Sequence, residues 1–270
     1  MFPHVMIAID FSPAWPLLEQ RLIRLRAKGV KRVSLVHIIS PKSLPSATES
    51  DIQALQDRLQ QQAEPLTELG LDTACYVDTG KPSEQLAAYA DKLAADLILI
   101  GCQGHGRWQE MLLGSTALNL AHLTRIPLWL EPVAQGEHGD AYNTIVLATD
   151  MSPTARKAER LFQTLAPHYQ HRVAIIAEQL LEADGYSIEA AQLHLTALAK
   201  RIPKLDAIVV PGEFKQVIIH EANAWQADVI IIGQQGHSRL HERLLGSTAQ
   251  TLLEGAACPV ILVPSTPQES

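Results

Sequence analysis

The chain has 270 residues, the length of about two ordinary domains, and its 47% hydrophobic content is enough to fill buried cores and argues against a disordered chain. The formal net charge is -7 and the basic residues are scattered, which argues against nucleic acid as a partner. The densest basic groups, at residues 21–28 and 156–160, are read as solvated helix faces. Three widely separated cysteines indicate reduced thiols, and no apolar run approaches the roughly 18–20 residues of a membrane span, so a soluble, cytoplasmic protein without a membrane partner is expected.

The predicted elements appear twice along the chain. The first copy predicts strands at 5–9, 32–39, 72–79, 97–100 and 128–130, with helices at 13–28, 51–69, 82–95 and 115–123 between them. The second copy predicts strands at 144–149, 172–178, 207–210, 229–232 and 260–263, with helices at 153–166, 187–201, 214–226 and 248–256. Alternating strands and helices, with several strands apolar throughout, predict parallel sheets covered by helices on both faces.

Two details of these helices are expected from local chemistry. Ser12 is the predicted N-cap of the first helix, with Pro13 at its first position, and Ser152 is interpreted likewise as a cap and not a nucleophile. Pro65 is expected to interrupt or end the second helix.

An internal repeat explains the doubled pattern. Residues 5–13 and 145–153 are both apolar runs that end in Asp-x-Ser-Pro, and the segments that begin at Asp96 and Asp228 share most of their glycines and the run Leu-Leu-Gly-Ser-Thr-Ala. The second copy is shorter around its second strand and second helix. The predicted domains are residues 1–133 and 143–265, joined by a polar linker at 134–142.

Each copy carries Gly-x-x-Gly, nine residues and then Gly-Ser-Thr. These residues are Gly101, Gly104, Gly114, Ser115 and Thr116 in the first copy, and Gly233, Gly236, Gly246, Ser247 and Thr248 in the second. The first glycine follows a strand and Gly-Ser-Thr opens a helix, so backbone N–H groups and the helix N-terminus suit a phosphate. Asp10 and Asp150 end the first strand of each copy at the same sheet edge, where a carboxylate suits a ribose hydroxyl.

Plainer interpretations of these residues stay open. The glycines would then be simple turns, and Ser-Thr a helix cap. His105 and His237 have no neighbouring carboxylate or nucleophile, so they are interpreted as loop-packing or phosphate-edge residues. Arg107 and Arg239 either pair with a phosphate or are solvated.

The combination of Asp-x-Ser, the glycine pattern, Leu-Leu-Gly-Ser-Thr-Ala and a final Pro-Val-x-x-Val resembles the universal stress protein family, in two copies over nearly the whole chain. The resemblance implies two tandem α/β domains of the Rossmann-like, adenine nucleotide alpha hydrolase-like fold. Each would hold a five-stranded parallel sheet in the order 3-2-1-4-5, flanked by helices. Members that keep the glycine pattern typically bind ATP, and both copies keep it.

The resemblance also assigns roles. Asp10 and Asp150 would meet the ribose or adenine, and the glycines and hydroxyls of the motif would hold phosphates. Adenine would be read by backbone groups just after His37, at Ile38. The matching stretch in the second copy is expected at residues 177–178, inside the shortened region, so the first copy is ranked as the more complete pocket.

The family pairs its last strands, so residues 128–130 and 260–263 would form an intrachain pseudo-dimer that closes two sheet edges, and a further homodimer of chains is left open. The implied function is an ATP-binding regulatory protein and nucleotide sensor in a bacterial stress response, with an unidentified protein partner. Magnesium or manganese would accompany a triphosphate through phosphate oxygens and water.

No lysine phosphate loop, kinase motif set or catalytic base is present, so no catalytic residue is expected and any ATP hydrolysis would be slow. Two alternatives remain. One is a pseudo-dimeric scaffold that binds a different small ligand or a partner protein. The other is a nucleotide-using hydrolase or transferase.

Overall fold

The computed structural model describes residues 2–41, 44, 47–102, 114–132, 143–153, 155–179, 181, 185–234, 252, 255–256 and 258–265. These residues form two compact units, unit 1 up to Pro132 and unit 2 from Asn143 onward. The linker predicted at 134–142 lies outside the described residues, and so does most of the helix predicted at 248–256.

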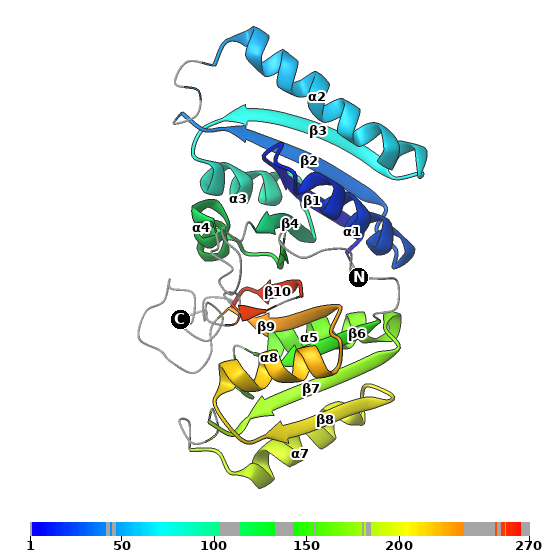
Figure 1. The fold of residues 1–270 in the computed structure, drawn as a ribbon, viewed down its shortest axis with the longest axis vertical. Coiled ribbons are helices and arrows are strands. Elements are labelled where there is room, and N and C mark those ends of the chain that lie inside the picture. The colour runs from blue at the N-terminus through cyan, green and yellow to red at the C-terminus, as the bar shows by residue number, and fades with distance from the viewer. Residues whose placement is uncertain are drawn as a thin grey trace. The chain divides into compact units, whose positions relative to one another are not determined.

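Unit 1 alternates strands and helices as predicted (Figure 1). Its elements are β1 (His4–Ile9), α1 (Trp15–Ala27), β2 (Arg32–Ile39), α2 (Glu49–Glu68), β3 (Asp72–Thr79), α3 (Pro82–Lys92), β4 (Leu97–Cys102), α4 (Ser115–Leu123) and β5 (Leu128–Pro132). The strand order is β3-β2-β1-β4-β5 with parallel neighbours, which confirms the predicted order. Because right-handed crossovers run in opposite directions on the two sides of β1, α1 and α2 lie on one face, and α3 and α4 pack together on the other.

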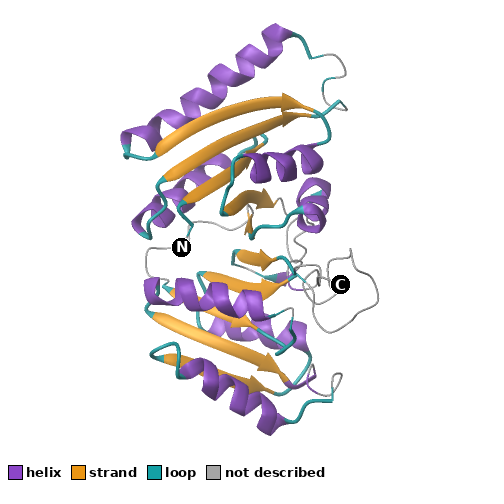
Figure 2. Cartoon of the chain, turned by 180° about the vertical axis from the view of Figure 1, so that it is seen from behind, coloured by secondary structure: helices purple, strands orange, loops and turns teal. Residues whose placement is uncertain are grey.

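Unit 2 repeats this topology. Its elements are β6 (Thr144–Ala148), α5 (Arg156–Leu165), the short 3₁₀ helix η1 (Ala166–His168), β7 (His171–Ala177), α7 (Ile188–Ala199), β8 (Leu205–Val210), α8 (Phe214–Ala224), β9 (Val229–Gly233) and β10 (Val260–Val263). The order β8-β7-β6-β9-β10 is again parallel throughout and matches unit 1 strand for strand. Figure 2 shows the same elements from behind, with the strands of each unit between helices.

The central strands form the cores. Val5 and Ile7 of β1, Leu97 of β4, and Ile145 and Leu147 of β6 are completely buried, since helices cover both faces of each sheet. Within the described part of the chain, no helix is both long and apolar enough to cross a bilayer.

The first helix of each unit starts later than the sequence predicts. α1 begins at Trp15 with Ala14 at its N-cap, and α5 begins at Arg156 with Ala155 at its N-cap, so the assignments of Ser12 and Ser152 as N-caps are wrong. In each unit the serine carbonyl instead accepts the N–H three residues on, from Trp15 at 3.4 Å and from Ala155 at 3.1 Å, and this turn precedes the helix. Pro65 lies inside α2 and does not interrupt it, but the helix ends soon afterwards at Glu68, so only the last turn lies beyond the hydrogen bond that the proline cannot donate.

Arg21 was expected on a solvated helix face, and this expectation is wrong. Arg21 is 5% exposed, and its guanidinium donates to both oxygens of Glu131 on β5, from Nε at 2.9 Å and from Nη2 at 3.1 Å. The indole N–H of Trp129 donates to the same carboxylate at 2.8 Å. A buried carboxylate needs such charge-assisted partners, and Glu131 therefore draws this arginine inward.

Candidate functional site

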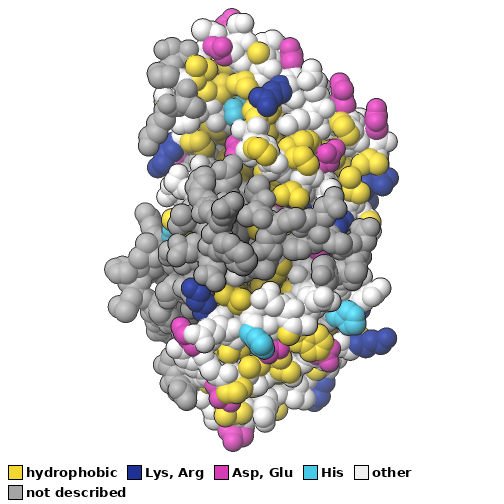
Figure 3. Space-filling model, viewed as in Figure 1, with side chains coloured by type: hydrophobic (Ala, Val, Ile, Leu, Met, Phe, Trp, Pro, Cys, Tyr) yellow, Lys and Arg dark blue, Asp and Glu magenta, His cyan; other side chains and the backbone are white. Residues whose placement is uncertain are grey.

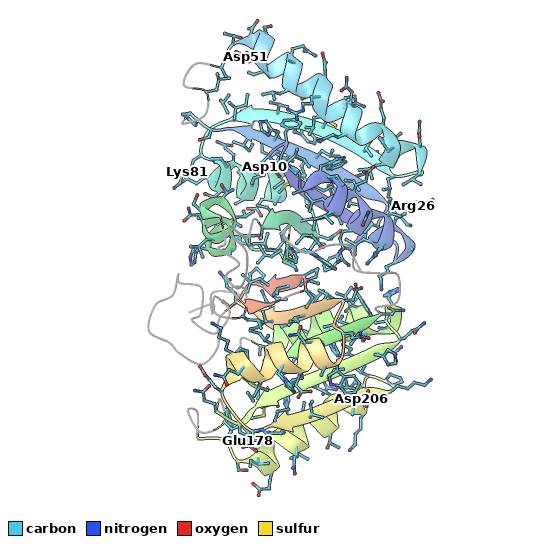
Figure 4. All side chains as sticks on the ribbon, viewed as in Figure 1. Asp10, Arg26, Asp51, Lys81, Glu178 and Asp206 are labelled. Carbon is cyan, nitrogen blue, oxygen red and sulfur yellow. The ribbon has the colours of Figure 1, made fainter. Side chains whose placement is uncertain are left out.

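The candidate site of each unit begins where the first strand ends. Asp10, labelled in Figure 4, follows β1, and Asp150 follows β6. In each unit one oxygen of the aspartate accepts the N–H of the serine two residues on, at 2.9 Å in both cases. The repeat therefore preserves an Asx turn at the carboxyl edge of the sheet.

The middle residue of this turn has a left-handed backbone in both units. Phe11 has φ 56° and Met151 has φ 63°. This conformation costs a residue other than glycine about 1–2 kcal/mol. Strain of this kind persists where the surrounding structure enforces it, and it concentrates at functional sites. Its presence in both units identifies the turn as a built feature.

The sheet register brings the other predicted groups to the same edge. In unit 1, β1 pairs Ile9 with His37 of β2 and Ala8 with Ile100 of β4, so Asp10, Ile38 and Gly101 stand at adjacent strand ends. In unit 2, Ala148 pairs with Ile232, which places Asp150 and Gly233 in the same way. In Figure 4, Asp51 and Lys81 also mark this edge of unit 1, and Arg26 marks the opposite edge.

The register also corrects one assignment. The repeat in the sequence predicts residues 177–178 as the counterparts of His37 and Ile38. Because β6 pairs Ala148 with Ile175, the counterparts of His37 and Ile38 are Ile176 and Ala177. The repeat offset already shortens by one residue before β7, so part of the deletion lies ahead of the second strand.

In unit 1 an aromatic and cationic stack covers the turn. The ring centroids of Phe11 and His37 are 4.6 Å apart, and Arg58 Cζ of α2 lies 4.2 Å from the Phe11 centroid. Burial lowers the pKa of His37, an effect that the Ile9 carbonyl and Asp10 oppose and that Arg58 reinforces. His37 is therefore neutral near pH 7, and its Nδ1–H donates to the Ile9 carbonyl at 2.7 Å.

Unit 2 fastens the turn by a different set of groups. Ile176 replaces His37, and Thr149 replaces Ile9 at the end of the first strand. Thr149 Oγ1 accepts the Met151 N–H at 3.3 Å and donates to Glu159 of α5 at 2.7 Å. The sequence predicts neither the stack of unit 1 nor the contact of Thr149 with Glu159 in unit 2.

The predicted phosphate side is described in part. Gly114 is the N-cap of α4 and, as a glycine, offers no side chain to cap it. The first residues of this helix, Ser115 and Thr116, are exposed and half-buried respectively. A Cβ added at Gly114 would meet no described atom within 4 Å, and its φ of -55° suits any residue. The remaining motif residues lie outside the described residues: Gly104, Gly236, Gly246, Ser247 and Thr248, together with His105, Arg107, His237 and Arg239.

Neither a basic cluster nor a metal site is evident around the described residues in view. On the face drawn in Figure 3 the lysine and arginine side chains stand apart from one another. Among the described residues no group of three or more histidine, cysteine, aspartate or glutamate side chains is arranged to hold a metal ion.

Fold and site together define a tandem α/β protein with one candidate ligand edge in each unit. The chain belongs to the universal stress protein family, whose model matches residues 1–131 and again 141–264.

The chain is also similar to individual proteins. Universal stress protein Rv2623 of Mycobacterium tuberculosis is 24% identical over 96% of this chain and 95% of its own length. The crystal structure of a universal stress protein from Archaeoglobus fulgidus covers 98% of this chain and 97% of its own, at 16% identity and a TM-score of 0.77. A universal stress protein solved in complex with cAMP covers 47% of this chain and 100% of its own, at 22% identity and a TM-score of 0.38.

Proposed function

We propose that this protein is a cytoplasmic regulatory protein that binds adenine nucleotide, above all ATP, and reports nucleotide state to a partner protein in a bacterial stress response. The observation that carries the proposal is Gly114. Neither its backbone conformation nor its described neighbours require a glycine. Close approach of a ligand phosphate to the backbone at the start of α4 explains the residue.

In this proposal each group at the edge has one task. The Asp10 carboxylate accepts a ribose hydroxyl, and backbone groups at Ile38 read the adenine edge. The phosphates are held by Gly101, Gly104, Gly114, Ser115 and Thr116. The corresponding groups of unit 2 are Asp150, Gly233, Gly236, Gly246, Ser247 and Thr248. Magnesium or manganese would bind through phosphate oxygens and water.

Unit 1 is proposed as the stronger site. Its edge carries the Phe11, His37 and Arg58 stack, whereas unit 2 has Met151 and Ile176 at the two corresponding strand-end positions. Flat aromatic and guanidinium groups suit a purine better than flexible aliphatic ones do. No catalytic residue is assigned, and any ATP hydrolysis is proposed to be slow.

The test is direct. Purified protein is denatured, released nucleotide is identified by chromatography, and ATP, ADP and AMP are titrated calorimetrically into the stripped protein. Binding of ATP, with loss of one site in Gly114→Val and of the other in Gly246→Val, supports two nucleotide sites. Absence of ATP and ADP binding at millimolar concentration overturns the proposal in favour of a scaffold for another ligand. The intrachain pseudo-dimer and a homodimer of chains stay predictions, and light scattering tests the second.

A further inference from the structure

A relay of hydrogen bonds runs from α7 to the Asp150 turn of unit 2. His194 Nε2 lies 2.8 Å from Glu159 Oε1, and the Thr149 hydroxyl lies 2.7 Å from the same oxygen. Thr149 Oγ1 in turn accepts the Met151 N–H at 3.3 Å. The relay therefore connects a partly exposed helix residue to the left-handed residue of the turn.

Each link has a fixed direction. A hydroxyl has one proton, so Thr149 gives it to Glu159 and is left to accept from Met151. Glu159 accepts from both Thr149 and His194 at the same oxygen, Oε1, which uses both lone pairs of that atom. Burial by itself raises the pKa of Glu159, but the bonds from His194 and Thr149 and the positive Arg156 outweigh it and leave the pKa below its usual value.

The charged surroundings of Glu159 are simple among the described residues. Arg156 acts on it from its own helix α5, His194 acts from α7, and β6 contributes only the neutral Thr149 beyond its end. The side chain of Glu159 is 10% exposed and that of His194 is 30% exposed. The carboxylate is thus held ionised between two helices by partners on both sides.

Unit 1 has no such relay. Ile9 stands where unit 2 has Thr149, and Glu19, at the position of Glu159, makes no side-chain hydrogen bond with the described residues. The ring of the left-handed residue of unit 1 instead contacts both His37 and Arg58. The two units therefore fix the same strained turn by different means.

We propose that Glu159 and His194 are positioning residues of the unit 2 site. They orient the Thr149 hydroxyl, which fixes the Met151 N–H and thereby the direction of the Asp150 carboxylate. This inference rests on the proposed nucleotide function, and it assigns the relay no contact with the ligand. A turn fixed in its binding geometry before the ligand arrives binds more tightly.

The experiment uses the full chain carrying Gly114→Val, which weakens unit 1, and all further variants are compared in that background so that the differences between them report unit 2. Thr149→Val removes the hydroxyl at nearly constant shape, and Thr149→Ser retains it. His194→Phe removes the outer link. One hydrogen bond corresponds to up to about a tenfold change in affinity. ATP affinity is expected to fall by about this factor in Thr149→Val and by less in His194→Phe, and to be restored in Thr149→Ser.

A second readout does not depend on nucleotide. Amide hydrogen exchange at Met151 is expected to accelerate in Thr149→Val and His194→Phe, while exchange at Phe11, the matched position of unit 1, stays unchanged. Unchanged exchange at Met151 overturns the relay. Equal losses of affinity in Thr149→Val and Thr149→Ser overturn it too, because the hydroxyl would then not be the link. Accelerated exchange without ATP binding to any of these proteins supports the relay as an anchor of the turn and overturns the nucleotide function of unit 2.

Discussion

The substitution Gly114→Val should weaken ATP binding by unit 1 while leaving the stability of the protein nearly unchanged. The backbone of Gly114, at φ -55° and ψ 147°, suits a β-branched residue, and no described atom lies within 4 Å of an added Cβ. Replacing glycine reduces the conformational entropy of the unfolded chain, which stabilises the folded state by about 0.4–1 kcal/mol. Loss of glycine at an N-cap costs up to about 1 kcal/mol, so the two effects nearly cancel. A phosphate held by a backbone N–H is worth about 1.5–3 kcal/mol, so ATP affinity should fall at least about tenfold.

Urea unfolding and ATP calorimetry on the same preparations measure both quantities. Gly80→Val is the matched control, because Gly80 has φ 140° and an added Cβ would meet Gln85 Cγ at 2.9 Å. This control should lose stability while Gly114→Val keeps it. Two results would refute the reasoning. One is a fall in the free energy of unfolding of more than about 2 kcal/mol in Gly114→Val, which exceeds the two opposing effects. The other is ATP binding by that variant with wild-type affinity.

Other predictions concern buried charge. Arg21→Met strands the Glu131 carboxylate and should lower the free energy of unfolding by about 3–5 kcal/mol, whereas Arg32→Ala, at an exposed salt bridge, should lower it by at most about 1 kcal/mol, both by urea denaturation. The pKa of Glu159 is lowered from 4.5 in the folded chain, so its contribution to stability is present above that value and is lost as the pH falls through the folded pKa; Glu159→Gln should flatten this acid limb in pH-dependent unfolding. Burial raises the pKa of the Cys102 thiol to about 12, so mass spectrometry should find it unmodified by iodoacetamide at neutral pH unless the chain is unfolded.

The sequence predicted the fold because the evidence for it is local and doubled. Apolar strand runs alternate with helical runs, and the same order recurs at nearly constant offset, so errors in one copy are visible against the other. Element ends were predicted less well than the elements themselves. Ser12 resembles an N-cap, but its carbonyl accepts the Trp15 N–H in a turn ahead of the helix, and no signal in the sequence distinguishes these two outcomes.

The site was predicted where it depends on motifs and missed where it depends on tertiary contacts. Asp10 and Gly101 could be placed at one edge because parallel strands end together. Arg58 and His194 lie on helices, and tertiary packing sets how each helix is rotated about its axis. The neighbouring residues in the sequence therefore do not predict which groups these two side chains contact. Glu131 did carry a signal, since a carboxylate in an otherwise apolar strand requires a buried cation.

One pair of variants tests whether the left-handed backbone of the turn contributes to ATP binding or only to the fold. Phe11→Ala and Phe11→Gly both remove the ring, but only glycine also relieves the left-handed backbone. Phe11→Gly should therefore be more stable than Phe11→Ala by about 1 kcal/mol in urea unfolding. Its ATP affinity should nevertheless be lower, because glycine gives the turn more backbone freedom that must be lost when the ligand binds. If affinity instead follows stability across the pair, the turn is a structural feature of the fold, and the strain at Phe11 has no part in binding.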